Sequence, residues 1–273
     1  MSEDGAELPV TSSEEPSWAP DAYACYQGVL RGLLQSGIPF AISGGFAFHH
    51  HTGIWRTTKD LDLVVPPGAV PTAFKVLVDE GFETYVQDPV WLAKARRGDY
   101  FVDLITGVGN ATLTVEQSWI DRAREDEVLG IRCKILGVEE MIASKLFVTR
   151  RERFDGADIA HLLLAQARNL DWARLRKLTA THWQMLYWHL VLFAYIYPAR
   201  AVEIPQFVWR ELHNNFGEFT ANPPANQPFH GTLIDPKMFA IDVNEWGEPD
   251  LYRELCDNYP YPLKEKNTTR SKE

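Results

Sequence analysis

The sequence predicts an α+β fold in which an α/β-like core with a mixed sheet precedes a helical C-terminal domain. Short apolar runs alternate with helical patterns through the first 150 residues, and strand patterns stop after that point. The ends of the chain are richer in polar residues and proline. We therefore divide the chain into a disordered acidic tail (1–16), a core (17–150), a helical domain (151–217) and an irregular C-terminal segment (218–273).

In the first half of the core, the sequence predicts a helix, a strand, a turn and a second helix in succession. Apolar residues at helical spacing predict a helix over 21–35, and Gly37 and Pro39 end it. The apolar run 40–42 then leads through Ser43-Gly44-Gly45 into a helix over 46–51. A strand over 61–65 and a helix over 70–80 follow.

The second half of the core contains a predicted hairpin. Residues 91–96 and 100–106 are its strands, with a turn at 97–99. Residues 131–135 predict one more strand, and a helix follows from Gly137 to about residue 149. The helical domain is then predicted from four segments, which are 158–168, 172–178, 182–197 and 206–216.

Composition limits the classes of partner. Of 273 residues, 45% are hydrophobic and 23% charged, as in a soluble globular protein, and the formal net charge is −10. Such a charge disfavours loose, non-specific attraction to nucleic acid. Two basic runs, 94–97 and 150–153, are either local basic patches or solvated faces.

Cysteine usage and hydropathy favour a cytoplasmic protein. Three widely spaced cysteines suggest neither a disulfide framework nor a zinc site. The polar N-terminus does not resemble a signal peptide. The most apolar stretch, 183–197, is shorter than the roughly 20 residues that a membrane span needs, so we expect no membrane association.

Three acidic residues are the strongest candidates for catalysis. Asp60 and Asp62 begin an apolar strand, and because side chains alternate along a strand, both point to one face. Asp103 is flanked by apolar residues, where an unpaired carboxylate is costly to bury. If the strand at residue 100 lies beside the strand at residue 61, the three carboxylates form a site suited to Mg²⁺. The alternatives are solvated acids at a strand end and a satisfied or outward-facing Asp103.

A glycine turn upstream adds a phosphate-binding element. In Ser43-Gly44-Gly45 the glycines let the backbone approach a phosphate closely, and the following helix offers unpaired N–H groups. The serine hydroxyl can donate to a phosphate oxygen. A turn of this kind followed by Asp-x-Asp on the next strand favours a nucleotide-binding site.

These motifs resemble those of the polymerase-β-type nucleotidyltransferases. The resemblance is carried by Ser43-Gly44-Gly45-x-Ala47, His51 and Arg56-x-Thr58-x-Asp60-Leu61-Asp62-Leu63, and it continues through residues 139–145 and 155–162. Within the superfamily the sequence is most similar to the AbiEii- and MenT-like toxin nucleotidyltransferases. It is more distantly similar to the small aminoglycoside adenylyltransferases.

The resemblance implies a role for each site residue. Ser43, Gly44 and Gly45 would hold the triphosphate of an NTP. Asp60, Asp62 and Asp103 would be the catalytic acids and would ligate Mg²⁺, as two ions, with Asp103 accepting the proton of the attacking hydroxyl. Lys145 would contact phosphate, and Asp158, with Asp155 as the alternative, would orient that side of the pocket.

For two of the basic residues, a structural role is an alternative to nucleotide binding. Arg56 is either a triphosphate ligand or the partner of a nearby acid. Lys145 is either a phosphate ligand or a lysine whose stem covers apolar surface. The histidines His49 and His50 point in different directions on a helix and are more typical of a surface than of a zinc site.

The resemblance implies transfer of NMP from an NTP to an acceptor hydroxyl, with release of pyrophosphate. For a toxin-like member the acceptor is a tRNA 3′ end and an antitoxin protein is a partner. Two alternatives stay open. One is adenylylation of a small molecule or a protein hydroxyl, which the acidic charge favours. The other is a catalytically silent binding or regulatory protein, against which the intact set of acids argues.

Overall fold

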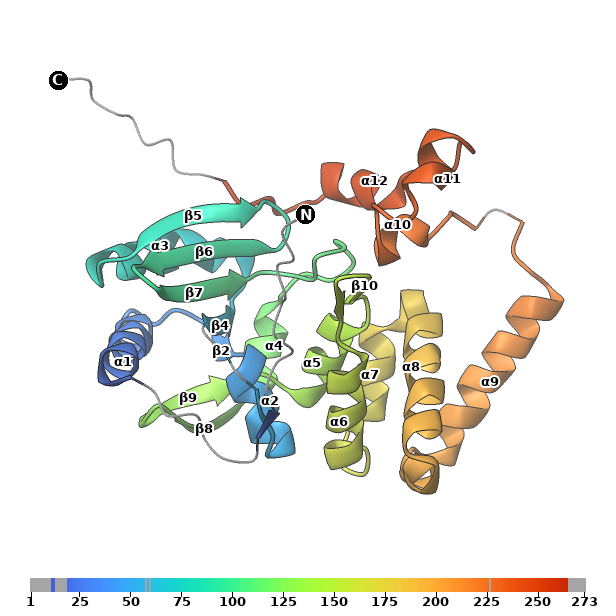
Figure 1. Cartoon of the computed structure of the whole chain (residues 1–273), viewed down its shortest axis with the longest axis horizontal. Helices are drawn as coiled ribbons and strands as arrows, with labels where there is room; N and C mark the ends of the chain where they lie inside the picture. The colour runs from blue at the N-terminus through green and yellow to red at the C-terminus, as the bar shows by residue number, and fades with distance from the viewer. Residues whose placement is uncertain (1–10, 13–18, 57, 59, 226, 265–273) are drawn as a thin grey trace, which may run out of the picture.

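The computed structural model describes residues 11–12, 19–56, 58, 60–225 and 227–264. A seven-stranded mixed sheet lies beside a stack of helices, and a group of short helices from the C-terminal end of the chain lies above that stack (Figure 1). The α+β fold class is therefore confirmed. Most of the acidic tail lies outside the described residues, apart from Thr11–Ser12, which form β1 and pair with β3 (Trp55–Arg56).

The sheet has the strand order β5-β6-β7-β4-β2-β9-β8. The pairs β4·β7 and β2·β9 are parallel, and the other neighbours are antiparallel. The strands are β2 (Ala41–Ile42), β4 (Asp60–Val64), β5 (Glu83–Asp88), β6 (Leu92–Arg97), β7 (Tyr100–Ile105), β8 (Arg124–Val128) and β9 (Ile131–Ile135). A separate two-stranded hairpin consists of β10 (Thr149–Arg150) and β11 (Arg153–Phe154).

The first helices pack on the sheet, and the later ones pack on one another. Helix α1 contacts β9 and α3, while α5, α6, α7, α8 and α9 form the stack beside the sheet (Figure 1). The helices of the core are α1 (Pro20–Gln35), α2 (Gly44–Thr52), α3 (Val70–Asp79), α4 (Gln117–Arg122) and α5 (Val138–Lys145). Those that follow are α6 (Gly156–Gln166), α7 (Trp172–Leu178), α8 (Trp183–Ile196), α9 (Gln206–Ala221), α10 (Gly231–Ile234), α11 (Ala240–Asn244) and α12 (Leu251–Asp257).

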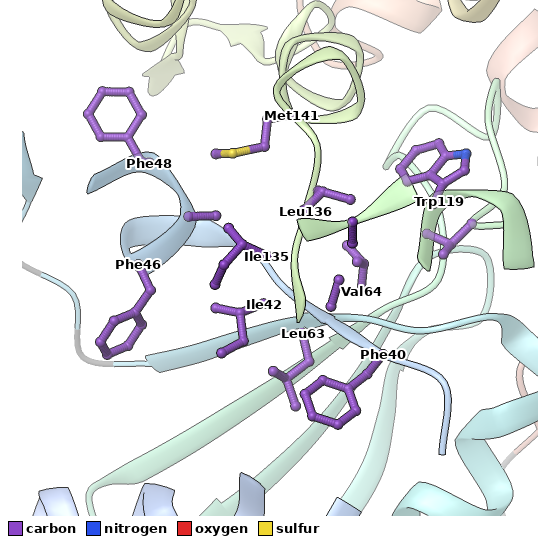
Figure 2. Close-up of a cluster of buried hydrophobic side chains, with 14 of the residues drawn as sticks. Phe40, Ile42, Phe46, Phe48, Leu63, Val64, Trp119, Ile135, Leu136 and Met141 are labelled. Atoms are coloured by element: carbon purple, nitrogen blue, oxygen red, sulfur yellow. The ribbon is translucent and has the colours of Figure 1, made fainter. Parts of the chain in front are cut away.

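The hydrophobic core fixes the central strands. Leu61 and Leu63 of β4 are fully buried, and Asp60 and Asp62 alternate with them on the opposite face. Figure 2 shows Leu63 grouped with Ile42 of β2 and Ile135 of β9. Burying such side chains contributes about 1.5–3 kcal/mol each, so the position of β4 in the sheet is strongly determined. The two aspartates are thus held on a rigid element.

The C-terminal segment differs from the irregular structure that we expected. It contains the short helices α10, α11 and α12, and hydrogen bonds join it to the core. The Tyr259 hydroxyl lies 2.8 Å from the Thr114 hydroxyl, and the Leu263 N–H donates to the Pro89 carbonyl at 2.7 Å. These helices are too short to show a clear helical period, so their sequence did not predict them.

Two further boundaries differ from the predictions. Helix α5 ends at Lys145, before the expected residue 149, because residues 149–154 form the β10–β11 hairpin. Helix α9 continues to Ala221, past the end that we placed at residue 217 for the helical domain. Among the described residues, no helix has the length and apolar character needed to cross a bilayer.

Candidate active site

Two predicted acids meet on neighbouring strands. Asp62 of β4 and Asp103 of β7 are register partners in the parallel pair, so both side chains lie on the same face of the sheet. Asp60 lies on this face one pleat earlier, opposite Phe101. The structure therefore brings Asp103 to the Asp-x-Asp strand, as the sequence predicted.

Gly44 of the glycine turn lies against Asp62. A Cβ at position 44 would be 1.8 Å from Asp62 Oδ2, and Gly44 has a φ of 56°. Only glycine satisfies both conditions without strain. The Ser43 N–H donates to the Asp62 carbonyl at 2.8 Å, so the turn and the Asp62 strand are hydrogen-bonded to each other.

Ser43 and Gly44 also begin helix α2, for which Ser43 is the N-cap residue. The Ser43 side chain is buried and makes no capping hydrogen bond within the protein. Gly45 packs against the Thr58 side chain, where a Cβ would lie 3.1 Å from Thr58 Cβ. The N-terminus of α2 thus faces the carboxylate of Asp62, and a helix N-terminus favours negative groups such as phosphate.

The carboxylates are difficult to ionise together. Burial, aided by the charges of Asp103 and Asp60, raises the pKa of Asp62 to about 7. Burial also raises the pKa of Asp103, although Lys94 opposes that rise. A cluster of this kind is relieved by a cation, because a nearby positive charge favours the ionised form.

Lys94 of β6 supplies one such cation from within the chain. It is the register partner of Asp103 in the antiparallel β6·β7 pair. Its Nζ lies 2.8 Å from Asp103 Oδ1 and 2.9 Å from Oδ2, and both side chains are mostly buried. Burial disfavours the charged lysine, but the hydrogen bond to Asp103 and the negative charges of Asp103 and Asp60 together outweigh it and raise the pKa of Lys94.

A second charged group, from α5 and α6, stands opposite the acids. Lys145 Nζ donates to Asp155 Oδ2 at 2.7 Å and to Asp158 Oδ2 at 2.8 Å. Arg153 makes two hydrogen bonds to Asp155, of 3.0 and 3.1 Å. Burial opposes ionisation of Asp155, but Lys145 and Arg153 outweigh it and hold its pKa below the usual range.

Arg56 is turned toward this second group and not toward the glycine turn. Its guanidinium pairs with Asp158 at 2.5 Å and lies over the Phe48 ring, 4.7 Å from the centroid. Asp158 is therefore shared by Arg56 and Lys145. This is the pairing with a nearby acid that was one of the two interpretations of Arg56.

A pocket of about 410 Å³ separates the two charged groups. Asp62, Asp103, Ser43 and Gly44 line it on one side, and Lys145, Arg150, Arg153 and Asp155 line it on the other. Aromatic and apolar side chains complete it, among them Trp91, Trp119, Met141, Phe147 and Leu233. Asp60, Gly45, Arg56 and Asp158 were predicted as site residues but do not line this pocket.

The acids of β4 fit the oxygen donors that a bound Mg²⁺ would need. Carboxylate oxygens of Asp60 and Asp62, next to a turn that can hold phosphates, are the ligands that Mg²⁺ prefers. In the part of the chain that the structure describes, no three His, Cys, Asp or Glu side chains are already gathered closely enough to hold an ion together. Asp103, the expected third ligand, is paired with Lys94.

Sequence reasoning missed several residues of the pocket. Lys94 and Arg153 were noted only as members of basic runs, Trp91 only as the first residue of a predicted strand, and Trp119 was not singled out. The turn predicted at 97–99 is one residue too long and would place Ala93 opposite Asp103, whereas the observed pairing of Arg97 with Tyr100 places Lys94 there. The basic run at 150–153 had a second signal, since it ends two residues before Asp155.

An Asp-x-Asp strand, a third acid and a glycine turn thus meet beside one pocket, as the sequence predicted for a nucleotidyltransferase. The family described as nucleotidyl transferase of unknown function (DUF2204) matches residues 23–181, and the chain belongs to that family. The narrower similarity to AbiEii- and MenT-like proteins stays a prediction.

Several solved structures are similar to the chain at low identity. The antibiotic-resistance factor ANT(2″)-Ia is 16% identical, with a TM-score of 0.42 over 63% of this chain and 96% of its own. An antigenic nucleotidyltransferase-like protein from Paracoccidioides brasiliensis is 18% identical, with a TM-score of 0.39 over 72% and 94%. JHP933 from Helicobacter pylori is 13% identical, with a TM-score of 0.37 over 75% and 99%. Comparison with curated protein sequences gives no match.

Proposed function

We propose that this protein transfers NMP from an NTP to an acceptor hydroxyl, with Mg²⁺ and with release of pyrophosphate. The observation that carries the proposal is the register pairing of Asp62 with Asp103, with Gly44 packed on the Asp62 carboxylate. A catalytically silent protein has no need of a glycine fitted this closely to an acid that burial makes hard to ionise.

Each wall of the pocket has a task in this reaction. The Ser43–Gly44 turn and the N-terminus of α2 bind the triphosphate by donating hydrogen bonds. Lys145 binds phosphate from the opposite wall, and Asp155 and Asp158 hold its ammonium group there. Asp60 and Asp62 hold the Mg²⁺, which neutralises phosphate charge when it is bound.

The bond changes are those of an in-line displacement. The acceptor oxygen forms a bond to the α-phosphorus while the bond from that phosphorus to the bridging oxygen of the β-phosphate breaks, and pyrophosphate leaves. The proton of the acceptor hydroxyl goes to a carboxylate oxygen of Asp103, the acid on the adjacent strand. Little covalent participation is required of the protein, so correct placement of these groups supplies most of the catalysis.

The acceptor that we propose first is a tRNA 3′ end. Its support is the resemblance carried by Lys145 and by the Asp155–Asp158 segment, together with Arg150 and Arg153 at the pocket. An antitoxin protein would then be a partner. The alternative acceptor is a small-molecule or protein hydroxyl, which the net charge of −10 favours.

One labelling experiment tests these proposals together. The purified protein is incubated with Mg²⁺, each α-³²P-labelled NTP in turn, and either total tRNA or a mixture of small metabolites and proteins. Label on RNA supports the tRNA acceptor, and label on another molecule supports the alternative. Absence of label and of pyrophosphate with every NTP and acceptor would refute nucleotidyl transfer.

A further inference from the structure

The third acid of the site already has a cation. Lys94, Asp103 and Asp62 form a row across β6, β7 and β4, because Lys94 and Asp62 are both register partners of Asp103. The side chains of directly opposed residues lie on the same face of a sheet. The contact between Lys94 and Asp103 is therefore fixed by the backbone, and it does not depend on a long side chain happening to reach a distant acid.

The ammonium group lies beside both oxygens of the carboxylate, but only Oδ2 accepts a hydrogen bond from it, and the buried Oδ1 accepts none from the described residues. Lys94 Nζ lies 2.8 Å from Oδ1 and 2.9 Å from Oδ2. The exposed fractions of the two side chains are 20% and 12%, so water replaces this contact poorly. An ion bound to Asp103 would have to share those oxygens with a positive charge at close range, and in a partly buried site such repulsion is weakly screened.

The rest of the cluster lacks this compensation. Among the described residues, neither Asp60 nor Asp62 forms an ion pair with a lysine or an arginine, in contrast to Asp103. The carboxylates on β4 therefore still favour binding of a cation, whereas Asp103 is already neutralised. Asp60 and Asp62 on β4 thus differ from Asp103 on β7 in how readily they bind a cation.

We propose that Lys94 takes the place of a second metal ion, so that the site loads one divalent ion, at Asp60 and Asp62, with each NTP. This inference rests on the proposed function and replaces the two ions expected from the sequence. Lys94 acts through Asp103, so it is a positioning residue and not a catalytic one. It keeps metal away from Asp103, which leaves the carboxylate available as the proton acceptor.

The test is a count of bound ions that does not depend on turnover. The full chain is titrated with Mn²⁺ in the presence of the α,β-methylene analogue of each NTP in turn. Free Mn²⁺ is measured by electron paramagnetic resonance, and bound analogue is measured by equilibrium dialysis. We expect one Mn²⁺ per bound analogue for the wild type and two for Lys94→Met, which keeps the aliphatic stem and removes the charge.

Matched variants separate the effect of removing the charge beside Asp103 from the effect of removing a positive charge elsewhere. Lys75→Met removes one charge at an exposed position of α3 and should leave the count at one. Adding Asp103→Asn to Lys94→Met should return the count from two to one. If Lys94→Met does not fold, as judged by circular dichroism, Lys94→Gln takes its place.

The outcomes distinguish this inference from the function on which it rests. The role of Lys94 would be overturned if the wild type bound two Mn²⁺ ions per analogue, with affinities within threefold of those measured for Lys94→Met. A count that stays at one in both Lys94 variants would overturn it as well. If the wild type binds no analogue with Mn²⁺, the proposed function itself fails.

Discussion

Gly44 and Asp62 are packed so closely that position 44 has no room for a side chain. A Cβ there would lie 1.8 Å from Asp62 Oδ2, in a residue whose φ is 56°. The turn that would hold the triphosphate is therefore packed directly against the acid that would hold Mg²⁺. Any change that separates them should impair both.

We predict that Gly44→Ala greatly reduces nucleotidyl transfer, because Asp62 must move to make room. Gly37→Ala is the matched control, since Gly37 has a φ of 65° and nothing within 4 Å of its Cβ position. The control should cost about 1 kcal/mol from backbone strain alone, and Gly44→Ala about 1–3 kcal/mol more from overpacking. Urea denaturation and the labelling assay measure both effects. Equal stabilities of the two variants would contradict the close packing.

Asp62→Ala should lower nucleotidyl transfer by at least about 10³-fold while the protein stays folded, because it removes an electrostatic group at the reacting phosphate. The measurement is initial velocity at saturating NTP, alongside a thermal melt. Asp99→Ala, in the exposed hairpin turn, should leave the velocity unchanged. Full activity in a folded Asp62→Ala variant would mean that the chemistry lies elsewhere.

The raised pKa of Asp62 makes the metal-free protein less stable as pH rises. In the unfolded chain the carboxyl loses its proton near its usual pKa of 3.8, whereas in the folded protein it keeps the proton until about pH 7. Between these values the folded state binds more protons, so the free energy of unfolding falls with increasing pH. Each pKa unit corresponds to about 1.4 kcal/mol, and we expect a loss of roughly 2–4 kcal/mol from pH 4 to pH 8.

Asp62→Asn, which cannot ionise, should remove this part of the pH dependence. The measurement is urea denaturation in EDTA at pH 5, 6, 7 and 8. The two proteins should differ most at pH 8, with the variant the more stable. Parallel curves for variant and wild type across the whole range would show that Asp62 ionises normally.

Arg56→Ala should affect stability more than nucleotide binding. It leaves the mostly buried Asp158 with Lys145 as its partner, and the loss of one partner from such a group costs about 1–3 kcal/mol. The KM for NTP should change less than threefold. Lys145→Met, at a position that lines the pocket, should instead raise that KM at least tenfold. A tenfold rise in KM for Arg56→Ala with unchanged stability would favour the triphosphate role.

The central strands of the fold were predictable because their apolar and polar residues follow a clear pattern. Leu61 and Leu63 alternate with Asp60 and Asp62, which predicts a strand with one buried face. The edge strands β5 and β8 were missed, since sequences such as Arg124–Val128 are mostly charged and exposed. An edge strand is held by backbone hydrogen bonds to its one neighbouring strand, so it forms without an apolar pattern in its sequence.

The acids of the site were predictable, but their partners were less so. The contact between Lys94 and Asp103 follows from a two-residue turn, because β6 and β7 pair from Arg97 with Tyr100 onward. Counting three residues back and forward from that pair reaches Lys94 and Asp103. In contrast, nothing local tells which acid Arg56 meets, because Asp158 lies on a helix about a hundred residues away. Such contacts depend on how the helices dock.

Leu233 of α10 lines the pocket, although it lies beyond the segment 23–181 that the family describes. A minimal fragment trimmed to those limits would keep every acid discussed above and still lack this apolar side chain of the binding pocket. It would also lose Tyr259 and Leu263, which tether the far end of the chain to the core. Biochemical assays on such a shortened protein would therefore underestimate its affinity for nucleotide, and the whole chain is the unit to assay.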